Sequence, residues 1–149
     1  MPDEPSSGLI AHAIQLAIAP VFLLTGIAGL LNVMATRLAR VIDRARAFEA
    51  MWPSLDARAR DVARQEVAIL EWRRRLCSSS INFSTAAALV ICLVIVALFV
   101  DEFFGRNIRW AAGGLFVVAL VLLICGLACF LREVYVATHT TSFDPDRYA

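Results

Sequence analysis

Three long blocks without any Asp, Glu, Lys or Arg constrain this sequence more than any other feature. They are Leu9–Val33, Phe83–Val100 and Trp110–Leu131. A helix needs about 20 mostly apolar residues to cross the hydrocarbon core of a bilayer. The first and third blocks reach that length alone, and the second does so when Ile81 and Asn82 join it. The sequence therefore predicts an all-α integral membrane protein with three transmembrane helices. A soluble helical protein with a large core is the alternative, but such runs lack the polar face that it needs.

The blocks divide the chain into seven expected segments. These are an N-terminal tail (1–8), a first span (9–34), a helical hairpin (35–80), a second span (81–101), a loop (102–109), a third span (110–132) and a C-terminal tail (133–149). The N-terminal tail, MPDEPSS, is acidic. A cleaved signal peptide begins with a basic region, so we expect the first block to remain as a membrane span.

The distribution of charge predicts the orientation of the chain. All 14 basic residues are Arg, and residues 35–80 hold ten of them against six acids, a net charge of +4. The segment Asp101–Arg109 holds two charges of each sign. Positively charged segments between spans stay in the cytoplasm. We therefore expect residues 35–80 and the C-terminus inside, and the N-terminus and the 102–109 loop outside.

Residues 35–80 are expected to form a long antiparallel helical hairpin. Leu55, Val62, Ile69 and Leu76 recur every seven residues, and Ala59, Ala63 and Leu70 broaden this apolar stripe. The outgoing helix offers a matching set: Leu38, Val41, Ile42, Ala45 and Phe48. Met51–Ser54, with Pro53, is the expected turn. The competing interpretation lays the second helix flat on the headgroups, but its acids alternate with its arginines, which favours the hairpin. Glu66, on the stripe, either pairs with Arg37 or Arg40 across the hairpin or reaches water.

One face of the first span gathers its polar and small residues. This polar stripe consists of His12, Gln15, Ala19, Phe22, Gly26, Gly29, Asn32 and Thr36, with Thr25 beside it. The opposite side offers Ala13, Ala17, Pro20, Leu24, Ile27 and Leu31 to lipid or to neighbouring helices. Polar groups in a span face protein or water, because lipid cannot hydrogen-bond them. The stripe either packs against another helix, with Gly26 and Gly29 allowing close approach, or lines a water-filled path built from several subunits.

Charged residues continue the first helix into the cytoplasm. Arg37, Arg40, Asp43 and Arg44 are either ordinary solvated charges or, in an oligomer centred on this helix, the cytoplasmic mouth of a path. Asp43 can pair with Arg40 or Arg46 at three residues' distance. Arg73, Arg74 and Arg75 precede the second span, where arginines commonly reach anionic lipid headgroups. Ser78–Ser80 can remain helical by bonding back to carbonyls of their own helix.

Two of these patterns carry a family resemblance. The first is the motif Pro-Val-Phe-Leu-Leu-Thr-Gly (Pro20–Gly26). The second is the charged pattern Arg-Leu-x-Arg-x-x-Asp-Arg-x-Arg (Arg37–Arg46), and the basic run Arg73–Arg75 follows later in the chain. Over about residues 10–135 the chain resembles an uncharacterised family of bacterial membrane proteins, a domain of unknown function. The resemblance implies a three-span protein of the bacterial inner membrane, so the outside of the predicted orientation is the periplasm. It implies no activity and no catalytic residue.

The residues point away from catalysis and from nucleic acid. His12 and His139 fall on opposite sides of the expected membrane, and no HExxH, phosphate loop or GxSxG motif is present. The acids among the arginines also argue against a nucleic-acid surface. Cys125 and Cys129 share a helix face, but no further Cys or His stands near them, so we expect packing rather than a metal site. We expect no enzyme, no metal and no cofactor.

These features lead to two expected functions. The first is a homo-oligomeric ion channel or pore lined by the first span, with Phe22 as a hydrophobic gate. The second is a non-conducting scaffold or regulatory subunit whose cytoplasmic hairpin docks a protein partner. A scaffold should bury the polar stripe against its own second and third spans, whereas a channel should not.

Overall fold

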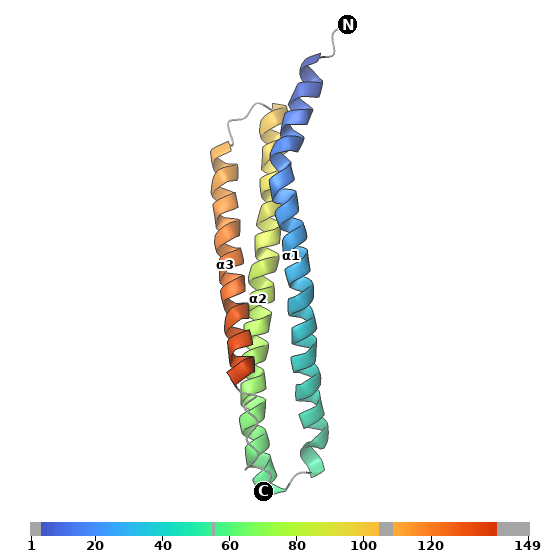
Figure 1. Cartoon of the computed structure of the whole chain (residues 1–149), viewed down its shortest axis with the longest axis vertical. Coiled ribbons are helices and arrows are strands. Elements are labelled where there is room, and N and C mark those ends of the chain that lie inside the picture. Colours follow the sequence, from blue (N-terminus) through green and yellow to red (C-terminus); the bar gives the residue numbers. More distant parts are fainter. Residues whose placement is uncertain (1–3, 55, 105–108, 140–149) are drawn as a thin grey trace.

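The chain is built from three long helices. The computed structural model describes residues 4–54, 56–104 and 109–139, and side chains over most of that range. Helix α1 (Glu4–Met51) leads through a short 3-10 turn, η1 (Trp52–Ser54), into α2 (Ala57–Phe104), and α3 (Arg109–His139) follows (Figure 1). Each helix contains a stretch long and apolar enough to cross a membrane. The all-α prediction with three candidate spans is confirmed.

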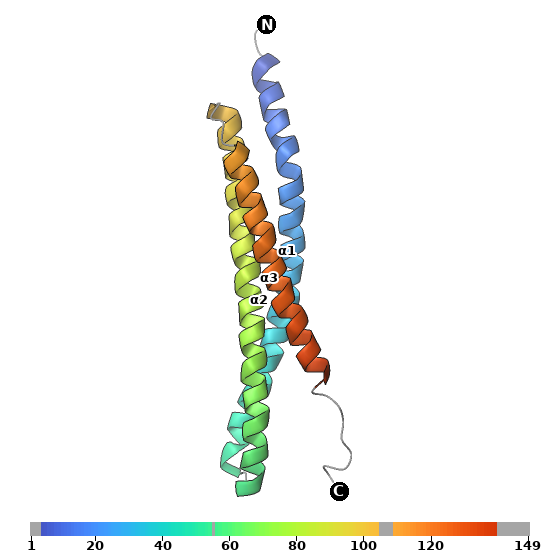
Figure 2. The same ribbon diagram turned by 90° about the vertical axis from the view of Figure 1, so that its left-hand side faces the viewer.

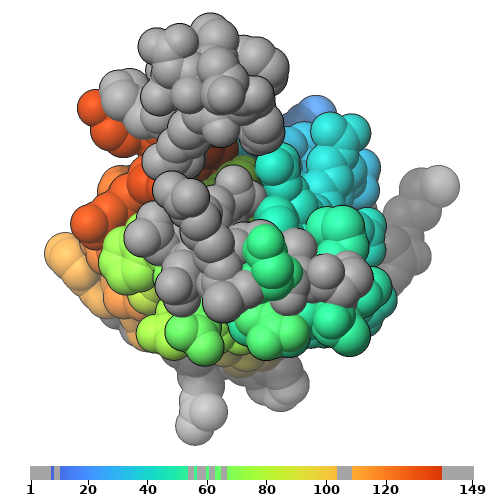
Figure 3. Space-filling model, turned by 90° about the horizontal axis from the view of Figure 1, so that it is seen from below, coloured from blue at the N-terminus to red at the C-terminus, as the bar shows by residue number. Residues whose placement is uncertain are grey.

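Helix α2 is the centre of the arrangement. It packs against α1 on one side and α3 on the other, and η1 turns the chain so that α1 and α2 run antiparallel. The lower parts of α1 and α2 extend beyond the end of α3, which crosses toward α1 as it descends (Figure 2). A view from the turn end places the turquoise and green ends of α1 and α2 beside each other, with α3 to one side (Figure 3).

The apolar core lies where the three helices meet. Its buried members are Ile27, Ala87, Ile91, Ala119 and Leu123. Many large apolar side chains in the same stretches point outward instead, among them Leu89, Leu93, Val117 and Ile124. In water such a surface would be unfavourable, but a bilayer accepts it. The arrangement is that of a multi-pass membrane protein.

The lower parts of α1 and α2 pack through a narrower seam. Val41 of α1 and Ala63 and Leu70 of α2 are buried there. The sequence predicted a stripe through Ile69, which is 37% exposed. The buried row runs through Ala63 and Leu70, two residues that broaden the predicted stripe, and continues to Cys77. The side chains of Leu55, Val62 and Glu66 lie outside the described residues, and so does the expected pairing of Glu66.

Charged residues mark two levels along the bundle. Arg109 contacts Asp101 at 3.0 Å and Glu102 at 3.7 Å near one end, and Glu133 lies near the other. The 24 residues from Arg109 to Glu133 span about 36 Å, between the thickness of the hydrocarbon core and that of a whole bilayer.

Helix α3 is longer than the predicted third span. Helix α3 continues to His139, so the first seven residues of the predicted 133–149 tail are helical. Residues 1–3, 105–108 and 140–149, which belong to the predicted tails and loop, lie outside the described part of the chain.

Candidate functional site

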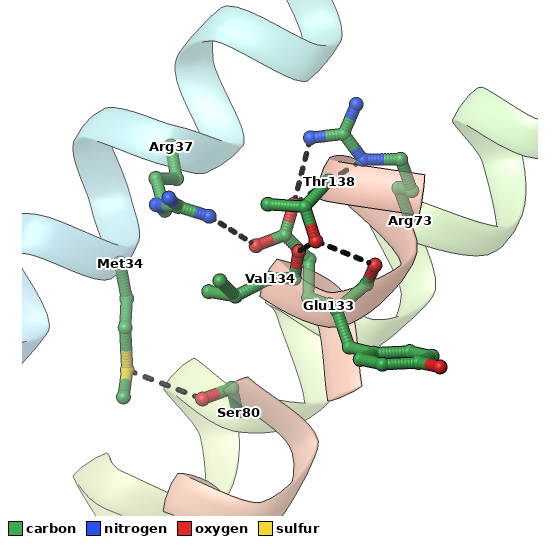
Figure 4. A network of polar contacts seen from close by, with 8 residues as sticks. Met34, Arg37, Arg73, Ser80, Glu133, Val134 and Thr138 are labelled. Carbon is green, nitrogen blue, oxygen red and sulfur yellow. Dashed lines mark hydrogen bonds and ion pairs between the residues drawn. The ribbon is translucent and has the colours of Figure 1, made fainter. Parts of the chain in front are cut away.

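A buried carboxylate joins the three helices at the level where α3 leaves the expected membrane. Glu133 of α3 is completely buried. Its Oε2 accepts a 2.7 Å hydrogen bond from the guanidinium of Arg37 in α1. Its Oε1 accepts two from Arg73 in α2, at 2.8 and 3.2 Å. Figure 4 shows the carboxylate between the two arginines (Figure 4). We call these three residues the arginine–glutamate clamp.

The clamp forms because three helices bring charge to the same depth. Arg37 follows the first charge-free block, Arg73 precedes the second, and Glu133 follows the third by two residues. A buried carboxylate is tolerated only when it is paired and hydrogen-bonded. The two arginines are only partly covered, with side-chain exposures of 38% and 22%. The clamp therefore carries one net positive charge that reaches its surface.

Aromatic rings hold two arginines near the clamp. The guanidinium carbon of Arg37 lies 5.4 Å from the centre of the Phe130 ring. The guanidinium carbon of Arg132 in α3 lies 5.5 Å from the ring centre of Trp72 in α2. Such stacking is favourable for a guanidinium, which is weakly hydrated and planar. Arg37 of α1 is thus held by two residues of α3, the Glu133 carboxylate and the Phe130 ring.

About two helical turns from the clamp, α2 and α3 come into close contact. The Ser80 Oγ donates a 2.7 Å hydrogen bond to the Gly126 carbonyl and lies 3.2 Å from the Met34 sulfur. A Cβ placed on Gly126 would lie 2.7 Å from the Ser84 Oγ. The expected bond from Ser80 back to its own helix is therefore wrong. The hydroxyl bonds across to α3, because Gly126 brings a backbone carbonyl within reach.

Sequence reasoning missed Glu133 as a site residue. The prediction placed it at the start of a tail and assigned Arg37 and Arg73 to a cytoplasmic mouth or to lipid headgroups. The available signal was an acid two residues after a charge-free block, at a depth where two other spans carry Arg. The basic run does not act as a unit: Arg74 is exposed, 4.0 Å from Glu71, and Arg75 is also exposed.

The polar stripe of α1 points away from the other two helices. Every member, from His12 to Thr36 and including Thr25, is exposed, and Phe22 reaches 75% exposure. The opposite side, with Ala13, Ala17, Pro20 and Ile27, is the one buried against the bundle. The face that the sequence offered to either lipid or helices thus packs inside the chain.

Among the described residues, the two threonine hydroxyls of the stripe bond within their own helix. The Thr25 hydroxyl donates to the Val21 carbonyl at 3.3 Å and that of Thr36 to the Asn32 carbonyl at 2.9 Å. A Cβ added to Gly26 or Gly29 would meet nothing within 4 Å. The chain itself therefore gives no packing reason for these two glycines. The arrangement expected for a scaffold, with the stripe buried inside its own chain, is wrong.

Beyond the clamp, the remaining charges of α1 reach solvent. Arg40, Asp43 and Arg44 are exposed and make no ion pair with any residue that the structure describes. The expected pairing of Asp43 with Arg40 or Arg46 is therefore absent among these residues. Cys125 is exposed and Cys129 partly so. Within the described part of the chain, no group of three or more His, Cys, Asp or Glu could hold a metal ion.

Comparison with known proteins identifies the family. The model described as "Protein of unknown function (DUF2721)" matches residues 17–143, most of the chain. The chain belongs to this family. The match includes both the polar stripe from Ala19 onward and all three residues of the clamp, and it confirms the resemblance inferred from Pro20–Arg46. No curated protein and no solved structure was found to match the chain.

Proposed function

We propose that this DUF2721 protein is a homo-oligomer of the bacterial inner membrane whose subunits meet through the polar stripe of α1, and that the stripes together line an ion pathway. The N-terminus is periplasmic, and the α1–α2 hairpin and the C-terminus are cytoplasmic. No catalytic step is assigned to it. Arg74 and Arg75 contact anionic lipid headgroups of the inner leaflet.

The outward direction of the polar stripe is the observation that supports this proposal most strongly. Polar groups at membrane depth need protein or water around them. Three helices are too few to enclose a pore, and α1 turns its polar side away from α2 and α3. A second copy of the chain is the simplest structure that would cover Gln15 and Asn32 and fill the open space at Gly26 and Gly29.

The depth of the stripe residues suggests where such a pathway would close. Counted from Arg37 at one level to His12 at the other, Thr25 lies about midway, and Phe22 about 4 Å from it. The polar Gln15 and Asn32 lie toward the two ends. A large apolar side chain among small ones is the composition of a hydrophobic constriction, which stops ions by dewetting.

Flux through purified protein in liposomes tests the pathway. We expect measurable ion flux from the wild type and a higher flux from Phe22→Ser, because a smaller polar side chain wets the constriction. Leu93→Ser, on an outward apolar position of α2, is the matched control and should leave flux unchanged. Light scattering of the same preparations should give a symmetric oligomer. A monomer in several mild detergents and in lipid discs would end the proposal. An oligomer that shows no flux, either as the wild type or as Phe22→Ser, would also end it.

Orientation has its own test. A cysteine at Ala57, near the hairpin turn, should react with a membrane-impermeant maleimide only after the cytoplasmic side is opened. Labelling of intact cells from the periplasm would contradict the proposed orientation.

A second candidate function is a scaffold or regulatory subunit that docks a cytoplasmic protein. The observation behind it is the hairpin, whose lower part extends beyond the end of α3 (Figures 1 and 2). The exposed stripe does not support this candidate, which therefore rests on the hairpin alone. Oligomers that conduct nothing, either as wild type or as Phe22→Ser, would favour it over the channel.

A further inference from the structure

A groove between α1 and α2 begins just below the arginine–glutamate clamp, where α3 ends. It encloses about 240 Å³. Four arginines line it, Arg37, Arg40, Arg44 and Arg73, together with three apolar residues, Val41, Leu70 and Ala137. The groove belongs to a single chain, so it exists whether or not subunits associate.

Positive charge exceeds negative charge in this groove. No acid is among the described residues that line it, and Glu133 engages one nitrogen of Arg37 and two of Arg73 from outside the lining. A guanidinium has five N–H donors, so both residues retain donors that the carboxylate does not use. Arg40 and Arg44 make no hydrogen bond or ion pair with any residue in the described ranges. Asp43, the nearest acid along α1, is not part of the lining.

Its depth and composition match the phosphate group of a membrane lipid. Arg40 lies one turn beyond Arg37, about 5 Å past the clamp and just outside the charge-free spans. Guanidinium forks fit a tetrahedral oxyanion with paired hydrogen bonds. The buried Val41 and Leu70 give the groove an apolar floor suited to the carbon atoms next to a phosphoester.

We infer that this groove is a binding site for an anionic phosphate group, held by Arg40 and Arg44 together with the unused donors of Arg37 and Arg73. The phosphate comes either from an anionic phospholipid of the inner leaflet or from free phosphate. Arg37 and Arg73 are pre-positioned by Glu133, so they lose little freedom when the anion binds. The inference rests on the proposed function only for insertion of the chain in a membrane, and it fails separately from self-association.

The test is a titration of the full-length, delipidated protein, read by native mass spectrometry and by thermal shift. The probes are phosphatidylglycerol, phosphatidylcholine with the same chains, and inorganic phosphate. The site variant is Arg40→Gln/Arg44→Gln, which breaks no described ion pair. The matched control is Arg46→Gln/Arg60→Gln, which removes the same charge at two exposed positions of the hairpin that do not line the groove.

We expect one phosphatidylglycerol per chain to bind more tightly than the others and than any phosphatidylcholine. The site variant should weaken that binding roughly 30-fold, at about 1 kcal/mol for each juxtamembrane arginine, and the control by less than about threefold. Competition by inorganic phosphate at similar concentration would identify free phosphate as the ligand, and no competition would identify the lipid. Equal weakening in both double variants, or equal binding of both lipids with no binding of phosphate, would overturn the inference.

Discussion

Two glycine positions in the spans have opposite surroundings. At Gly126 of α3 an added Cβ would press against the Ser84 Oγ at 2.7 Å and against the α2 backbone at 3.2 and 3.3 Å. At Gly29 of α1 it would meet nothing within 4 Å. The first glycine is explained by the chain's own packing, and the second is not. The difference separates an inner seam, where α2, α3 and the clamp fit closely, from an outer face of α1 that the rest of the chain does not cover.

The largest expected effect is at the clamp, on the inner seam. Glu133→Gln keeps the shape of the side chain but leaves Arg37 and Arg73 without their shared anion. Breaking a buried ion pair costs about 3 kcal/mol or more, reduced here because both arginines are partly exposed. We expect a loss of roughly 2–3 kcal/mol in thermal or denaturant unfolding in detergent. Glu71→Gln, at an exposed pair with Arg74, should cost about 0.5 kcal/mol or less. Equal stability of the two variants would mean that the clamp does not hold the helices together.

The second effect compares the two glycines directly. Gly126→Ala should destabilise the chain by about 1–3 kcal/mol, because α2 and α3 must move apart. Gly29→Ala should leave the stability of a single chain unchanged or raise it, since Ala favours a helix over Gly by about 1 kcal/mol. Unfolding of both variants in a detergent that keeps the chain monomeric measures the contrast. Adding Ser84→Ala to Gly126→Ala should restore only part of the loss, because the backbone contacts remain.

The smallest effect compares two hydroxyl groups. Ser80→Ala removes the hydrogen bond to the Gly126 carbonyl and should cost about 0.6 kcal/mol, the average for such bonds between membrane helices. Thr36→Val removes a bond within α1 alone and should cost close to nothing. A double-mutant cycle of Ser80→Ala with Gly126→Ala should show coupling, and independent effects would place the contact between α2 and α3 in doubt.

The architecture could be predicted because it follows from long-range composition. Charge-free blocks of sufficient length, such as Trp110–Leu131, predict a span whatever their neighbours do. The amphipathic side of α1 was also visible, since polar residues recur at helical spacing. The spacing of these polar residues could not show which side of α1 packs against the other helices of the chain. Ala13 and Ile27 suited lipid and protein equally well, and only the position of α2 decides between them.

The clamp could not be predicted because it depends on how three separate helices pack and which of their residues come to the same depth. Glu133 follows Arg132 directly after a charge-free block, and this position alone does not distinguish a buried carboxylate from an early charge of a solvated tail. Its partners lie 96 and 60 residues away, and their pairing requires that α3 cross toward α1 at its lower end. The same argument applies to Gly126, whose need for a small residue comes entirely from Ser80 and Ser84 on another helix.

Helix α2 also has a mechanical property. From Ala57 to Phe104 its sequence contains no Gly and no Pro, so it has none of the usual points at which a helix bends. It is a stiff rod about 72 Å long, resting on α3 at Ser84, with arms of about 40 Å toward the hairpin and 30 Å toward Phe104. A tilt of about 5° around that rest would move the hairpin end by roughly 3.5 Å and the far end by roughly 2.6 Å the opposite way. A rigid tilt of α2 would therefore couple a displacement of the hairpin end to a smaller and opposite displacement at Phe104.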